Sequence, residues 1–192
     1  MSAKLAEILK TALIQMWTSL VHPFIRQSVH IPTEYPSSNE NTETSMTELL
    51  LEILSYYGIK EVVGDKHNPD IVAMFADIGH DYIKDDETAW CSALLNFFCK
   101  KLGYERSGKL DARSWLKLPV MVLKPQVGDI VVLWRKIPDS WEGHVGLFIS
   151  WDEDSVYVLG GNQSNMLSIA PYPRERVLGF RQARKLSDIK PA

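Results

Sequence analysis

Residues 85–99 read Asp85-Asp86-Glu87-Thr88-Ala89-Trp90-Cys91-Ser92-Ala93-Leu94-Leu95-Asn96-Phe97-Phe98-Cys99. From Cys91 onward, apolar side chains recur with the spacing of one helical face, at Leu94, Leu95, Phe98 and Leu102. Gly103 follows as the expected end of the helix, and Asp86 or Thr88 is expected to cap its start. The pattern predicts a largely buried helix with Cys91 in its first turn.

Two roles for Cys91 are compatible with this position. A thiol at a helix start lies near unpaired backbone N–H groups and the positive end of the helix dipole, which would lower its pKa and make it nucleophilic. A buried cysteine on a core face can equally be an inert apolar residue. Cys99 follows eight residues later, roughly 12 Å along the helix, which is too far for a disulfide. We therefore expect Cys99 to be structural.

Composition excludes several classes of protein. The chain has 192 residues and a formal net charge of −3, with no long basic run, so nucleic-acid binding is not supported. Neither a Cys-x-x-Cys pair nor a His-Glu-x-x-His motif occurs, and no metal or other cofactor is expected. No apolar run is long enough to span a membrane, and Lys4, Glu7 and Lys10 interrupt the start. We expect synthesis in the cytoplasm without a signal peptide.

The first 44 residues differ in character from the rest. Leu5, Ile8, Leu9, Ala12, Leu13, Met16 and Leu20 predict an amphipathic helix. A polar segment broken by prolines follows at residues 31–44, which is typical of a linker. We therefore divide the chain into residues 1–44 and a main domain, 45–192. The apolar stripe can pack on the main domain or meet a second chain, and we expect the former.

The main domain is predicted to begin with helices and to end with strands. Ser45-Met46-Thr47-Glu48 is a capping box that opens a first helix, Asn68-Pro69 opens a second, and the Cys91 helix is the third. Strands are expected at residues 130–134, 143–151 and 155–161, with shorter ones near 166–170 and 177–181, arranged as a meander. Helices followed by an antiparallel sheet of about five or six strands predict an α+β fold.

His144 and Asn162 are candidates for polar chemistry because each lies at the end of a predicted strand. His144 begins the 143–151 strand, and Asn162 follows the neighbouring 155–161 strand. A short hairpin would set these two ends side by side. A cysteine nucleophile needs a base, and an imidazole base needs a group that fixes its tautomer. An ordinary strand histidine and an ordinary turn asparagine are the alternatives.

Four short motifs occur in a fixed order along the chain: Trp90-Cys91-Ser92-Ala93, Gly128-Asp129-Ile130-Val131-Val132, Gly143-His144-Val145-Gly146 and Val158-Leu159-Gly160-Gly161-Asn162-Gln163. Together they resemble the NlpC-type and CHAP-type cysteine peptidase/amidase superfamily, from about Leu49 to Arg181. The resemblance implies a circularly permuted papain-like fold, with Cys91 as nucleophile, His144 as base and Asn162 orienting the imidazole. Two departures stand out. Many CHAP enzymes have a glutamate in place of Gly160, and a glutamine in place of Trp90.

The resemblance implies a peptidoglycan hydrolase that cleaves an amide bond in or next to the stem peptide. Candidate substrate-binding residues are Trp90, Arg113, Trp115, Trp141 and Gln163. A phage lysis enzyme and an injected antibacterial effector both fit, acting on the cell wall or periplasm after release or injection. An immunity or delivery protein is a possible partner. The alternative is a catalytically inactive papain-like binding domain in which Cys91 belongs to the core.

Overall fold

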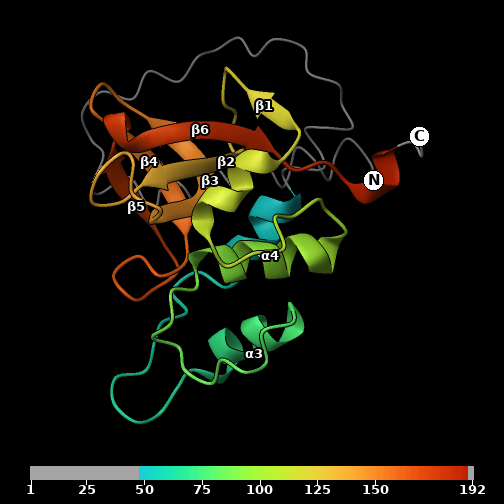
Figure 1. Ribbon diagram of the computed structural model, residues 1–192, viewed down its shortest axis with the longest axis vertical. Helices are drawn as coiled ribbons and strands as arrows, with labels where there is room; N and C mark the ends of the chain where they lie inside the picture. The colour runs from blue at the N-terminus through green and yellow to red at the C-terminus, as the bar shows by residue number, and fades with distance from the viewer. Residues whose placement is uncertain (1–47, 190–192) are drawn as a thin grey trace. The chain divides into compact units, whose positions relative to one another are not determined.

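The computed structural model describes residues 48–189 (Figure 1). The predictions for the N-terminal helix, the linker, the domain boundary at residues 44–45 and the start of the capping box lie outside this range. The first described helix covers residues 48–54. Helix α3 (Pro69–Asp77) begins as predicted, because the side chain of Asn68 accepts a hydrogen bond from the Asp70 N–H at 3.0 Å and Pro69 occupies the first turn.

Helix α4 (Cys91–Leu102) has the predicted bounds but not the predicted cap. Gly103 ends it with φ of 71°, in the left-handed region that favours glycine. At its start the cap position is Trp90, which makes no side-chain capping bond. Asp86 is fully buried instead and accepts hydrogen bonds from the backbone N–H groups of Val62 and Asn68, each at 2.8 Å. The predicted capping by Asp86 or Thr88 was wrong, because Asp86 holds the 62–68 segment and the Thr88 hydroxyl donates to Asp85.

The strands form one antiparallel sheet of six strands in the order β1-β6-β2-β3-β4-β5. Their bounds are β1 Val120–Val122, β2 Ile130–Trp134, β3 Gly143–Trp151, β4 Ser155–Gly160, β5 Ser168–Pro173 and β6 Val177–Gln182. A short 3-10 helix, η1 (Ala112–Lys117), precedes β1. The predicted α+β fold, with helices on an antiparallel sheet, is confirmed.

The predicted meander holds for β2 to β5 but not for β6. After β5 the chain crosses the sheet, and β6 pairs with β2 on one side and β1 on the other. Strand β1 was missed because it is only three residues long and its side chains are partly exposed, so it shows no apolar alternation.

The sheet packs on both of its faces. Inward residues of β2 and β3, such as Val132 and Leu147, share one core with the helices, whereas Leu133 and Phe148 belong to a second cluster. In Figure 1, α4 lies between the sheet and α3, which agrees with its contacts to β3, β4 and α3. The start of α4 is therefore held against the beginning of β3. Among residues 48–189, no helix has the length and apolar character needed to cross a membrane.

Candidate active site

Cys91 is buried at the first position of α4, with 6% of its surface exposed. Burial raises the pKa of its thiol, while hydrogen bonds from the backbone N–H groups of Val145 and Ser92 and the positive charge of Arg135 lower it in part. The predicted fall in pKa was wrong, because desolvation exceeds the stabilisation that the helix start provides. The resting group is a neutral thiol that lies against the backbone of β3.

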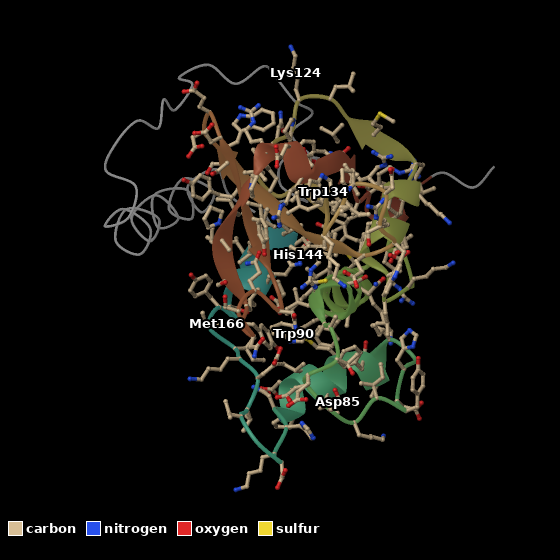
Figure 2. The ribbon with its side chains drawn as sticks, turned by 60° about the vertical axis from the view of Figure 1, so that its left-hand side comes forward. Asp85, Trp90, Lys124, Trp134, His144 and Met166 are labelled. Carbon is tan, nitrogen blue, oxygen red and sulfur yellow. The ribbon has the colours of Figure 1, made fainter. Side chains whose placement is uncertain are left out.

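His144 is the second residue of β3, and its ring is held by Gln163. The ring Nε2 lies 3.1 Å from Gln163 Oε1, and both side chains are buried. Tyr172 of β5 covers the ring at a centroid distance of 5.2 Å, with 32° between the planes. Figure 2 shows His144 between Trp134 and Trp90 in that view.

The amide of Gln163 determines which ring nitrogen of His144 carries the proton. Gln163 Nε2 donates to the carbonyl oxygens of Val158 at 3.2 Å and Ser168 at 2.5 Å, so Oε1 must be the acceptor. His144 Nε2–H therefore donates to Gln163, and the lone pair of Nδ1 is left as the basic site. Burial lowers the pKa of His144 to about 4, so the ring is neutral near pH 7.

Asn162 does not take the place predicted for it. Its side-chain Nδ2 donates to Glu61 Oε1 at 2.7 Å, and the bond to His144 comes from the next residue, Gln163. The same Glu61 oxygen accepts the indole N–H of Trp90 at 2.9 Å. Glu61 thus joins the residue before Cys91 to the residue before Gln163. The side chain that contacts the His144 ring is therefore that of Gln163, and Asn162 before it has a positive φ of 59°.

The thiol of Cys91 and the imidazole of His144 lie near each other but share no hydrogen bond. In residues 48–189, no hydrogen bond joins Cys91 Sγ to His144; the thiol instead meets the N–H of Val145, the next residue on β3. Tyr172, which packs against the His144 ring, is also close enough to Cys91 that a negative charge on the sulfur would raise the pKa of its phenol. The two groups therefore share one small region at the beginning of β3.

The other residues predicted to bind substrate divide into buried and exposed ones. Trp90 and Trp115 are fully buried, and Trp115 Nε1 donates to Ser92 Oγ at 2.8 Å, so neither indole lines a groove. Arg113 donates to the carbonyl oxygens of Glu142 and Pro138, at 3.3 and 2.5 Å, and so holds the β2–β3 loop. Trp141 of that loop is 78% exposed and is free to meet a ligand.

A cavity of about 220 Å³ opens beside His144 and Gln163. Its lining residues are Leu133, Trp134, Arg135, His144, Asn162, Gln163, Ser164, Tyr172 and Arg176. Arg135, Tyr172 and Arg176 were missed, because isolated arginines and a tyrosine in strands or loops carry no motif. Among the described residues, no cluster of His, Cys, Asp or Glu side chains is arranged to hold a metal ion.

No family model matches the sequence, and no curated protein matches it. A solved structure from Staphylococcus aureus subsp. aureus Mu50, described as similar to a lipoprotein of the NLP/P60 family, is similar to 88% of this chain, with 16% identity and a TM-score of 0.42. The chain spans about half of that protein, 48% of its length. At this identity and TM-score the similarity assigns no function.

Proposed function

We propose that the protein is a cysteine hydrolase of peptidoglycan that cleaves an amide bond in or next to the stem peptide. The observation that carries the proposal is the His144–Gln163 pair, which holds a neutral imidazole in one tautomer beside the start of α4. A buried imidazole N–H needs a hydrogen-bond partner in any role. A partner whose own amide is fixed by two backbone carbonyls also fixes the ring tautomer, which a catalytic base requires.

In this proposal the resting state is a neutral pair. Cys91 Sγ attacks the carbonyl carbon of the amide, and its proton passes to Nδ1 of His144. The resulting imidazolium is stabilised by the Nε2–H bond to Gln163 and gives its proton to the leaving amine. Water then attacks the thioester, with Nδ1 accepting the water proton, and releases the free acid and the Cys91 thiol.

Trp90 takes no direct part in this chemistry. Its only side-chain donor is already bonded to Glu61, so it does not replace the glutamine that many CHAP enzymes have before the cysteine. Backbone N–H groups at the start of α4 remain as donors to the developing oxyanion.

The experiment is digestion of purified peptidoglycan followed by mass spectrometry of the fragments. The wild-type protein should release new amines and carboxylates at one type of amide bond, and Cys91→Ala and His144→Ala should release none while keeping their circular dichroism spectra. Digestion by folded Cys91→Ala protein would remove this mechanism. Binding without digestion by the wild type would instead identify an inactive binding domain. We place the action at the cell wall or periplasm, after release or injection.

A further inference from the structure

The cavity beside His144 is rich in cationic and hydrogen-bond-donating side chains. Arg135 and Arg176 line it together with the hydroxyl-bearing Tyr172 and Ser164, and none of its lining residues is acidic. Burial raises the pKa of Tyr172 to about 12, and both arginines are close enough to oppose this rise. Arg135 also acts on Cys91 and His144. The positive charge therefore lies next to the proposed reacting groups.

Neither arginine is neutralised by the part of the chain that the structure describes. The six ion pairs within residues 48–189 involve other side chains. Nε of Arg176 is buried without a hydrogen-bond partner, while its guanidinium lies over the ring of Trp134 at 5.2 Å from the centroid. An unsatisfied buried donor is costly, and two unpaired guanidinium groups at one cavity favour an anion.

We propose that this cavity is a subsite for a carboxylate of the substrate, held by Arg135 and Arg176 next to the scissile amide. The inference builds on the proposed function and names the substrate class: peptides with a free carboxylate one residue or less from the cleaved bond. A volume of about 220 Å³ is below the ~300 Å³ of a typical small-ligand pocket, so the cavity suits one substituent rather than a whole muropeptide. Planar guanidinium groups match carboxylates in two-point hydrogen bonds.

The test compares one substrate pool in two forms. Soluble muropeptides, prepared with a muramidase, are divided, and one half is converted to carboxamides with a carbodiimide and ammonia. The wild type should cleave the carboxylate form with a kcat/KM at least about tenfold higher, the scale of one charge-assisted hydrogen bond. Arg135→Gln and Arg176→Gln should each lose about tenfold on the carboxylate form and change little on the carboxamide form.

Arg174→Gln is the matched control. Arg174 lies in the same 3-10 turn as Arg176, but it stacks on Trp151 at 4.5 Å and donates to the carbonyl oxygen of Asp152, and it does not line the cavity. Its substitution should keep the preference for the carboxylate form. Equal cleavage of both forms by the wild type would overturn the subsite while leaving the hydrolase intact.

Failure of the hydrolase itself gives a different result, because neither form is then cleaved. In that case the same two pools are titrated into wild-type protein by calorimetry. Tighter binding of the carboxylate form by the wild type, together with loss of this preference in Arg176→Gln, would support the carboxylate subsite. Equal binding of the two forms, or no binding, would contradict it.

Discussion

The start and the middle of α4 each carry a buried cysteine, and the two environments differ sharply. Cys99 is fully buried, and burial raises its pKa far above the usual range with only a weak opposing effect from Arg106. Cys91 is also buried, but three backbone N–H groups and Arg135 oppose the rise in its pKa. Within one helix, burial thus dominates at Cys99, whereas polar groups also surround the sulfur of Cys91.

The comparison shows that the helix start alone does not activate Cys91. Only the residues around the first turn distinguish it from Cys99: the backbone of β3, the His144–Gln163 pair, and Glu61, which ties Trp90 to Asn162. If these neighbours matter, changing them should make the start of α4 behave more like its middle.

The largest expected effect separates the two cysteines directly. Cys91→Ala should abolish cleavage of peptidoglycan, because the thioester cannot form, and the rates are compared by mass spectrometry of the fragments.

In native protein, iodoacetamide should label Cys91 slowly at pH 7 and faster as the pH rises, because its pKa is raised. Rapid labelling at pH 6 would show that the thiolate forms more easily than this environment allows.

A smaller loss is expected when the imidazole loses its partner. Gln163→Leu removes the acceptor for His144 Nε2–H and should lower kcat by about 10²-fold, the scale of a positioned base. Asn162→Ala should lose less, since Asn162 bonds to Glu61 rather than to the ring. An Asn162→Ala defect larger than that of Gln163→Leu would restore the original assignment of the orienting role.

Substitution of Glu61 should lower kcat by an intermediate amount. The loss should depend on the hydrogen-bond acceptor oxygen of Glu61 and not on its negative charge. Glu61→Ala removes the acceptor shared by Trp90 and Asn162 and is expected to lower kcat about tenfold. Glu61→Gln keeps an acceptor oxygen and should recover most of the rate with an unchanged KM. If Gln fails where Glu works, charge rather than hydrogen bonding is the property that counts.

The pH dependence tests whether His144 is neutral at rest. The pKa of His144 is about 4 in the folded protein, against an ordinary value of 6.5. Between pH 4 and pH 6.5 the unfolded chain therefore binds a proton at His144 that the folded protein does not bind. The contribution of His144 to the free energy of unfolding should therefore fall by roughly 1.4 kcal/mol per pH unit as the pH drops from 6.5 to about 4.

This contribution is isolated by comparing urea unfolding of the wild type and His144→Gln. Burial raises the pKa of Asp129 to about 6, so its contribution to the free energy of unfolding grows as the pH falls. Both proteins contain Asp129, so this contribution cancels in the comparison. Parallel stability curves for the two proteins would mean that His144 is not held neutral.

The smallest effect belongs to the middle of α4. Cys99→Ala should leave kcat and KM unchanged and lower the free energy of unfolding by about 1 kcal/mol, because one buried sulfur is lost from the core. Activity lost from a folded Cys99→Ala protein would contradict the contrast between the two positions.

The sequence was sufficient for the elements with strong periodicity. The bounds of α4, β2 and β3 were predicted closely, because apolar spacing, Gly103 and the glycines around His144 are local signals. Strand β1 and the crossover to β6 depend on pairing between residues far apart in the chain, which no local pattern records.

The site was predictable in part for the same reason. Cys91 and His144 lie at the ends of regular elements, so their neighbourhood followed from the motifs. The choice of Gln163 over Asn162 depends on which side chain the turn directs inward, and Glu61 lies 101 residues before the Asn162 to which it bonds. Burial of Trp90 and Trp115 likewise follows from tertiary packing, which tryptophan content alone does not reveal.

Gly160 leaves open the space that the His144–Gln163 pair occupies. A Cβ at this position would lie 3.1 Å from His144 Nε2 and 3.3 Å from Gln163 Oε1, so a side chain there competes with Gln163 for one space. Any side chain at position 160 therefore requires His144 or Gln163 to shift by a few tenths of an ångström. Gly160→Glu alone would crowd the existing partner before it could serve as a new one.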